Sequence, residues 1–276
     1  MSMKRRVKRS RPSRRSSVRR VSRSHKALYT GNHPEPLVSV IIPAMNEAGT
    51  IAAAIAEARK VHSRCEVIVV VNGSSDGTAE IAASCGGRVI SYVEPLGHDV
   101  GRSVGAESAK GDILLFTDGD LVIPASQLRP FMAAVKGGAD IALNDYSGPV
   151  HRSRPHPVVL SKHALNILLR RPDLKGCSMT AVPHALSRRA LDTLGSGILS
   201  SPPVAQAKAI LEGLKIEAAH KVPVGRMNVI RPKADGTDPL QQIIVADHLR
   251  AISLVLESGG ERAGFSDGTR RREMVR

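Results

Sequence analysis

Two carboxylates, Asp118 and Asp120, stand on either side of Gly119 just after the apolar run Ile113–Phe116. Such a run is typical of a strand that is buried on both faces of a parallel sheet. Because open α/β sheets bind ligands beyond the carboxyl ends of their strands, this pair stands where a ligand is expected. Carboxylate oxygens at this spacing can converge on a hard divalent cation, which holds substrate phosphates. The alternative is an ordinary turn, since Asp and Gly are common turn residues.

Two loops add further candidates for binding. Residues 73–77, which include Ser74, lie between a predicted strand and a predicted helix, where free N–H groups and the helix dipole favour an anion. The alternative is a plain turn in which Ser or Asp caps the helix. His98 and Arg102 precede or open another predicted helix, where a cation would assist a bound phosphate; the alternative is a solvated helix start.

The elements that must position these residues alternate between strand and helix. Strands are predicted over residues 37–43, 67–71, 88–92 and 113–116, with helices between them. This alternation indicates a parallel sheet with right-handed crossovers. The second half is less regular. There the sequence predicts helices over 126–135, 163–170, 187–194, 204–214 and 240–256, and strands over 141–143, 178–182 and 215–222.

The net charge of +15 is concentrated in the N-terminal segment. Residues 1–36 hold 12 Lys or Arg and one acid, whereas the other 240 residues hold 28 Lys or Arg and 24 acids. We predict that residues 1–36 form a basic, disordered tail and linker, because they carry too little apolar surface to fold. The tail is either a solubilising segment or an electrostatic tether to an anionic membrane or another polyanion.

Composition excludes several other classes of protein. No apolar run is long enough to span a membrane, and no apolar segment follows the basic N-terminus as in a secretory signal. Cys65, Cys85 and Cys177 form no CxxC pair, which argues against a disulfide framework or zinc site. We therefore expect a cytoplasmic protein, peripheral to the membrane if the tail is a tether. Three Tyr, three Phe and no Trp argue against a base-stacking nucleic-acid surface.

Three segments resemble the family 2 glycosyltransferases in their order and spacing: residues 38–47, 71–78 and 111–121. The resemblance implies the nucleotide-sugar transferase fold, an α/β three-layer arrangement with a mostly parallel Rossmann-like sheet. It also implies a division of the chain. We expect a glycosyltransferase domain over 37–257, with a nucleotide-binding half (37–121) and an acceptor half (122–257), followed by a flexible tail (258–276).

The resemblance also implies site residues for a nucleoside-diphosphate-sugar donor. Pro43, Ala44 and Glu47 would lie near a uracil or guanine base and the ribose, although Glu47 could equally cap its helix. Asp118 would contact the ribose or the sugar. Asp120 would bind Mg²⁺ or Mn²⁺ that bridges the diphosphate.

Within the family, residues 95–98, the Asp-Gly-Asp-Leu sequence and residues 225–232 are similar to the glucosyl- and mannosyl-3-phosphoglycerate synthases. Those enzymes are retaining and metal-dependent. The chain departs from them where His98 replaces a phosphate-facing Lys and Asn228 replaces a metal-binding His. It departs from the wider family at Asn72, where an acid usually contacts the base, and at residues 197–203, which carry no acid to serve as catalytic base.

We therefore predict a metal-dependent hexosyltransferase that moves a sugar from a nucleoside-diphosphate-sugar to an unknown acceptor, such as a phosphorylated small molecule. Asp118 and Asp120 are the predicted catalytic residues, and Asp120 and Asn228 the predicted metal ligands. A homodimer is a further expectation. The alternatives are transfer to polyprenyl phosphate at a membrane surface, and a non-catalytic protein that binds nucleotide-sugars.

Overall fold

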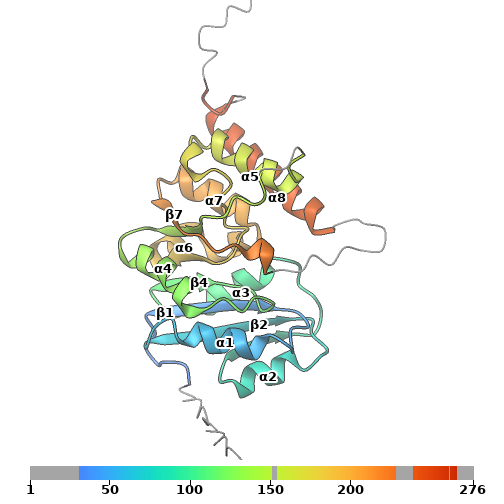
Figure 1. Ribbon diagram of the computed structural model, residues 1–276. Helices are drawn as coiled ribbons and strands as arrows, with labels where there is room; N and C mark the ends of the chain where they lie inside the picture. The colour runs from blue at the N-terminus through green and yellow to red at the C-terminus, as the bar shows by residue number, and fades with distance from the viewer. Residues whose placement is uncertain (1–30, 151–153, 228–238, 261, 266–276) are drawn as a thin grey trace, which may run out of the picture.

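The chain forms one seven-stranded sheet in the order β3-β2-β1-β4-β6-β5-β7 (Figure 1). This computed structural model describes residues 31–150, 154–227, 239–260 and 262–265. β6 runs antiparallel to β4 and β5, whereas the other neighbouring strands pair in parallel, so the predicted mostly parallel sheet is confirmed. The strands are β1 (Val38–Ala44), β2 (Cys65–Asn72), β3 (Arg88–Tyr92), β4 (Ile113–Phe116), β5 (Ile141–Asn144), β6 (His184–Ser187) and β7 (Ile216–His220).

Helices cover both faces of the sheet and complete the three layers. The described α-helices are α1 (Ile51–Arg59), α2 (Thr78–Ser84), α3 (Val100–Ser108), α4 (Ala125–Lys136), α5 (Pro157–Leu168), α6 (Arg188–Leu194), α7 (Pro202–Leu211) and α8 (Pro239–Gly259). Apolar side chains of α1, α2 and α4 share one core with the sheet, and those of α3, α6 and α7 share the other. In Figure 1, α5, α7 and α8 gather at the end of the molecule away from α1 and α2.

The buried central strands explain the uninterrupted apolar runs in the sequence. Val40 and Ile42 of β1 face the core that contains α1, whereas Ile41 between them faces the core that contains α3, and all three are fully buried. Since successive side chains of a strand point to opposite faces, a strand covered on both sides is mostly apolar at both sets of positions.

The prediction of a strand over residues 178–182 was wrong. These residues form turns, in which the Ala181 N–H donates to the Ser178 carbonyl at 2.9 Å, and the strand is β6 instead. Pro183 has no N–H to donate to a ladder, so pairing begins only at His184. β6 contains only two apolar residues, Ala185 and Leu186, so its sequence does not predict a strand.

The described residues at the start of the predicted flexible tail (258–276) pack against the helices. α8 continues to Gly259, Ala263 is buried, and the Arg170 guanidinium lies 5.2 Å from the centre of the Phe265 ring. The predictions for residues 1–30 and 266–276 lie outside the described residues. Among the described residues, no helix has both the length and the apolar character needed to cross a bilayer.

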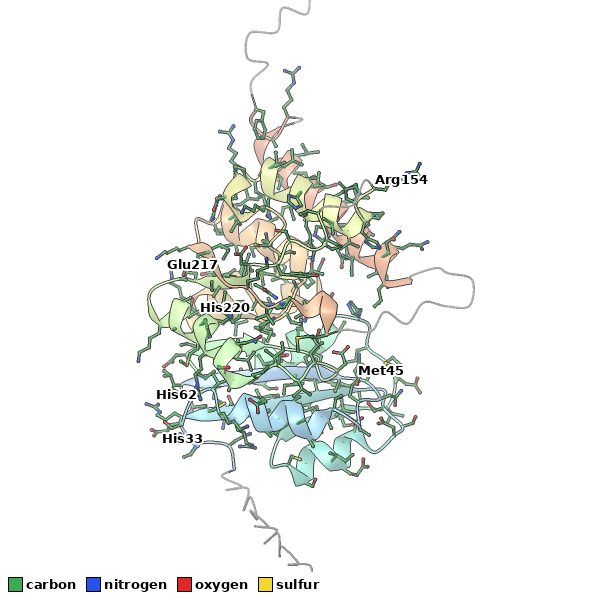
Figure 2. The ribbon with its side chains drawn as sticks, in the orientation of Figure 1. His33, Met45, His62, Arg154, Glu217 and His220 are labelled. Atoms are coloured by element: carbon green, nitrogen blue, oxygen red, sulfur yellow. The ribbon has the colours of Figure 1, made fainter. Side chains whose placement is uncertain are left out.

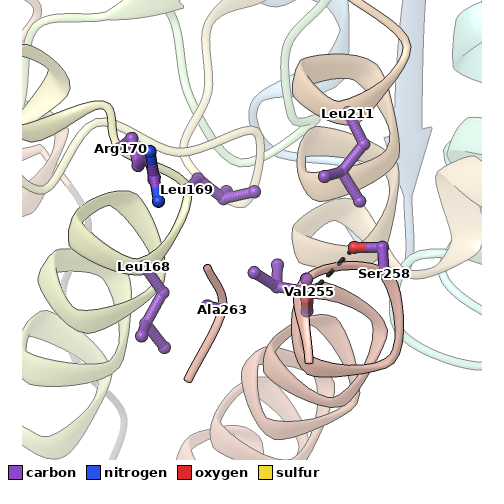
Figure 3. Close-up of a pocket in the computed structure, with 8 residues that line it drawn as sticks. Leu168, Leu169, Arg170, Leu211, Val255, Ser258 and Ala263 are labelled. Carbon is purple, nitrogen blue, oxygen red and sulfur yellow. Dashed lines mark hydrogen bonds between the residues drawn. The ribbon is translucent and has the colours of Figure 1, made fainter. Parts of the chain in front are cut away.

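A cavity of about 190 Å³ lies where the ends of α5, α7 and α8 meet (Figure 3). Its walls are mainly apolar, from Leu168, Leu169, Leu211, Val255 and Ala263. It is remote from the Asp-Gly-Asp turn, and its lining offers no group of polar side chains that would orient a substrate.

Candidate functional site

A cleft of about 480 Å³ opens at the carboxyl ends of β1, β2 and β4. The chain runs outward from β1 to β2 and β3 and then returns to β4 on the other side of β1, so this edge is a topological switch point. Figure 2 shows Met45, which lines the cleft, at the opposite end of the first strands from His33 and His62. Eight of the ten predicted site residues line it: Pro43, Ala44, Glu47, Asn72, His98, Arg102, Asp118 and Asp120.

The Asp-Gly-Asp turn packs directly against the end of β1. The Gly119 N–H donates to the Pro43 carbonyl at 3.0 Å. A Cβ at Gly119 would lie only 2.9 Å from Ala44 Cβ and 3.3 Å from Pro43 O, so the close approach requires glycine. Asp118 and Asp120 are both partly exposed on this turn, and they therefore open into the cleft beside Pro43 and Ala44.

Glu47 is held by the loop that follows β2. The backbone N–H groups of Asn46 and Glu47 donate to Ser74 Oγ and Thr78 Oγ1, each at 2.9 Å. The Thr78 hydroxyl and the Ala48 N–H both donate to the Asp76 carboxylate. These two hydrogen bonds lower the pKa of Asp76. Ser74 therefore binds the neighbouring loop and is not among the cleft residues, so the structure does not bring it together with the other predicted site residues.

Asn72 shapes the wall of the cleft from the end of β2. Its side-chain amide donates to the Gly97 carbonyl at 2.9 Å, and its oxygen accepts from the Leu96 N–H at 2.6 Å. The amide thus fixes the loop of residues 95–98, whose exposed His98 lies at the rim. Both bonds go to the protein itself, which leaves one amide hydrogen for a ligand.

Arg102 of α3 lies beneath the Asp-Gly-Asp turn and is only 5% exposed. The alternative interpretation of Arg102 as part of a solvated helix start is therefore excluded. Its Nη1 is 2.8 Å from Asp99 Oδ1, and its Nη2 is 3.4 Å from Asp118 Oδ1. Burial opposes the charge of the guanidinium, but Asp118 and Asp99 outweigh it and raise the Arg102 pKa. α3 can approach β1 this closely because Gly105 has no Cβ. A Cβ there would lie 2.4 Å from Ile41 Cγ2.

Three residues near the cleft escaped prediction from the sequence. Asp99 is 5% exposed, and burial raises its pKa. His184 is buried against Phe116, with ring centroids 4.9 Å apart, and burial lowers its pKa to about 3. Desolvation of the Lys162 amine on α5, together with the charge of Arg102, lowers its pKa to about 8. Only the i, i+3 spacing of Asp99 and Arg102 gave a signal in the sequence.

The donor set in the cleft fits a divalent cation shared with a diphosphate. Asp118 and Asp120 supply carboxylate oxygens, and Mg²⁺ in proteins commonly takes one or two carboxylates together with substrate phosphates and water. No cluster of three or more His, Cys, Asp or Glu ligands occurs in the described part of the chain, so a closed all-protein metal site is absent there. Asn228, the other predicted metal ligand, lies outside the described residues.

The segment in which the family resemblance implies a catalytic base contains a 3₁₀ helix, η2 (Ser196–Ser200), that leads into α7. η2 packs on α3, and Ser103 Oγ donates to the Gly197 carbonyl at 3.2 Å. Residues 197–203 contain no carboxylate, as the sequence showed, so this segment offers no general base.

Residues 39–191, just over half of the chain, match the family model of glycosyl transferase family 2. Glycosyltransferase AglE of Haloferax volcanii is 36% identical over 115 residues, which cover 38% of each chain. Undecaprenyl-phosphate 4-deoxy-4-formamido-L-arabinose transferase of Aeromonas hydrophila is 30% identical over 128 residues, or 43% of this chain and 38% of that protein. The similarity therefore spans less than half the length of these relatives.

Most of the fold is similar to that of a solved enzyme. The structure of glucosyl-3-phosphoglycerate synthase from Mycobacterium tuberculosis with Mn²⁺, UDP and glucosyl-3-phosphoglycerate superposes with a TM-score of 0.58. The identity is 22%, and the superposition covers 84% of this chain and 82% of that one. In sequence, the same enzyme is 34% identical over 106 residues, or 34% of this chain and 32% of that protein.

Proposed function

The chain belongs to glycosyl transferase family 2, and from this premise we propose that it transfers a sugar from a uridine-diphosphate-sugar to a phosphorylated acceptor. The observation that carries the proposal is the single cleft at the switch point of the sheet. It brings together Glu47 after β1, Asp118 and Asp120 after β4, and Arg102 on α3. The Mn²⁺ and UDP bound to the similar synthase support the choice of donor.

Each residue of the cleft has a role in this proposal. Pro43, Ala44 and Glu47 receive the base and ribose at the end of β1, where the loop after β2 fixes the backbone of Glu47. Asp118, turned toward the cleft above Arg102, hydrogen-bonds the ribose or the sugar. His98 at the rim lies toward the diphosphate.

Asp120 would hold Mg²⁺ or Mn²⁺, and Asn228 is the second proposed ligand. The ion would neutralise the charge that develops on the diphosphate leaving group, without a proton transfer. The chain's own contribution is to present Asp120 on a turn whose backbone is pinned to β1. A rigid turn keeps the carboxylate near its binding geometry before the donor arrives.

Lys162 favours an anionic acceptor. Among the described residues, no carboxylate lies within ion-pair distance of its desolvated amine, and the charge of Arg102 lies close enough to depress its pKa. A buried cation without a counter-charge is costly and gains stability when an anion binds. An acceptor phosphate or carboxylate would supply that anion.

A polyprenyl-phosphate acceptor is the second candidate, since it combines a phosphate with an apolar chain. Met45, Leu240 and Ile243 line the cleft and are 48%, 41% and 47% exposed, which leaves an apolar rim beside the polar floor. The A. hydrophila relative is named for an undecaprenyl-phosphate acceptor. Contact of the basic tail with an anionic membrane would accompany this activity.

Calorimetric titration with UDP and GDP, each with and without Mn²⁺, tests the donor site. We expect UDP to bind tightly only with Mn²⁺, and Asp120→Ala to weaken that binding by about 100-fold. Asp192→Ala, which changes an exposed carboxylate on α6, is the matched control and should bind as the wild type does. Mn²⁺-dependent binding that survives in Asp120→Ala would refute the proposed metal site. Transfer assays with phosphoglyceric acid and with undecaprenyl phosphate in vesicles then distinguish the acceptors.

A further inference from the structure

Arg102 lies between two carboxylates, one behind it and one in front. Asp99 approaches Nη1 at 2.8 Å from the interior, and Asp118 approaches Nη2 at 3.4 Å from the cleft. The Asp99 and Arg102 side chains are 4% and 6% exposed, whereas the Asp118 side chain is 33% exposed. The inner pair is thus the shorter and the more deeply buried of the two.

Helix capping does not explain the buried carboxylate of Asp99. Asp99 occupies the N-cap position of α3, but its side chain accepts no capping hydrogen bond from the helix. Its Oδ1 is buried and close to Arg102 Nη1, yet neither atom completes a well-aligned hydrogen bond. Burial of a charge without such bonds is expensive, so its main compensation is the charge of Arg102.

Charges of both signs surround Asp99. Asp118 and Asp247 of α8 are close enough to disfavour a charge on Asp99, whereas Arg102 and His98 favour it. Asp247 is itself paired with Arg250. Arg102 is therefore paired with both Asp99 and Asp118. The stronger its attraction to Asp99, the less strongly it holds Asp118.

We infer that Asp99 is a positioning residue that acts through Arg102 to keep Asp118 available to the donor. From the interior, Asp99 neutralises most of the charge of the Arg102 guanidinium. Arg102 then orients Asp118 through the longer contact without forming a tight ion pair that would draw the carboxylate out of the cleft. This inference rests on the proposed donor site, and it adds a residue that touches neither donor nor metal.

Asp99→Asn tests the inference because it removes the charge and keeps the shape. With only Asp118 left to neutralise it, Arg102 should pull Asp118 inward. We expect the Kd for UDP with Mn²⁺ and the KM for the donor to rise about 5- to 20-fold, with kcat changed less than about twofold. Asp173→Asn, which removes an exposed carboxylate paired with Arg171 at 2.7 Å, is the control and should change neither.

A double-mutant cycle separates action through Arg102 from a general loss of structure. In an Arg102→Lys background, Asp99→Asn should have little further effect on UDP affinity, because the pathway is already broken. Multiplied effects of the two substitutions would overturn the inference, as would a fall in kcat with an unchanged donor KM. Asp99→Glu, which keeps the charge, should retain UDP affinity within about threefold if charge is the cause; affinity as weak as that of Asp99→Asn would refute it.

The wild-type titration keeps the two proposals apart. Wild-type protein that binds UDP with Mn²⁺ while Asp99→Asn binds it equally well refutes the role of Asp99 and leaves the proposed function intact. Wild-type protein that binds no nucleotide under any condition overturns the donor site, and with it the positioning role.

Discussion

The two sides of the cleft are built in different ways. On the proposed donor side, each predicted site residue that lines the cleft lies within a few positions of the end of β1, β2 or β4, or on the loop and helix between β3 and β4. On the proposed acceptor side, Lys162, His184 and Asp247 come from α5, β6 and α8, which are far apart in the sequence, and these three residues are not among those that line the cleft. The residues of the proposed donor side are therefore positioned by the strand ends of the parallel sheet. Those of the proposed acceptor side come together only when the helices pack against one another.

This difference suggests where each side is vulnerable. Changes at strand ends should alter ligand binding and leave stability nearly intact, because β2 and β4 beneath them are buried along their whole length. Changes that loosen the β5-β6-β7 part of the sheet or the α5–α8 packing should alter stability first. Four substitutions test the contrast, and the largest effect is expected on the acceptor side.

Asp140→Asn should reduce stability by about 2–3 kcal/mol, because Asp140 ties three strands together. It is 4% exposed and accepts from Arg189 Nε, from the Lys215 N–H and from Ser187 Oγ. Urea unfolding should show the loss at pH 7, while UDP affinity stays within twofold of the wild type. A variant that loses UDP affinity but not stability would contradict the contrast.

The same carboxylate makes a specific prediction about pH. Burial alone would raise the pKa of Asp140, but its hydrogen bonds with Arg189, Lys215 and Ser187 lower it overall. A carboxyl with a depressed folded-state pKa stabilises the fold above its ordinary pKa and loses that contribution as the pH falls through the folded-state value. The stability difference between wild type and Asp140→Asn should therefore shrink under acid conditions.

Gly119→Ala should weaken UDP binding by about 10- to 30-fold while costing little stability, since the new Cβ must push the turn away from Ala44 and Pro43. Gly197→Ala on η2 is the matched control, because a Cβ there meets no atom within 4 Å. Thermal unfolding and UDP calorimetry on both variants make the comparison. Equal effects of the two substitutions would show that close contact with β1 does not position the carboxylates.

Lys162→Met should change the pH dependence of stability by about 1–2 kcal/mol. Burial lowers the folded-state pKa of the amine to about 8, below that of an unfolded lysine. The unfolded chain then binds more protons between the two values, so wild-type stability should rise as the pH increases above 8. Urea unfolding from pH 7 to 10 should show a flatter profile for Lys162→Met, whereas Lys175→Met, at an exposed position, should keep the wild-type slope.

The contrast also explains what the sequence could predict. Asp118, Asp120, Glu47 and Asn72 follow recognisable apolar strands, and the alternation of strands and helices indicates that those ends share one edge. Nothing local marks Lys162 or His184, because their environment is created by contacts between elements distant in the chain. β6 escaped prediction for the same reason: its two apolar residues become a strand only between β4 and β5.

Ser74→Ala should have the smallest effect, and it decides between two interpretations of the donor side. The sequence suggested that Ser74 binds the donor, whereas its hydroxyl accepts from the Asn46 N–H and thus supports the loop that carries Glu47. If that support is its only role, UDP affinity should fall less than about threefold, with a stability loss of about 0.5–1 kcal/mol. Ser84→Ala, at the exposed end of α2, is the control for the loss of a hydroxyl. A tenfold loss of UDP affinity at unchanged stability would instead establish direct contact with the donor, and would extend the donor site beyond the cleft.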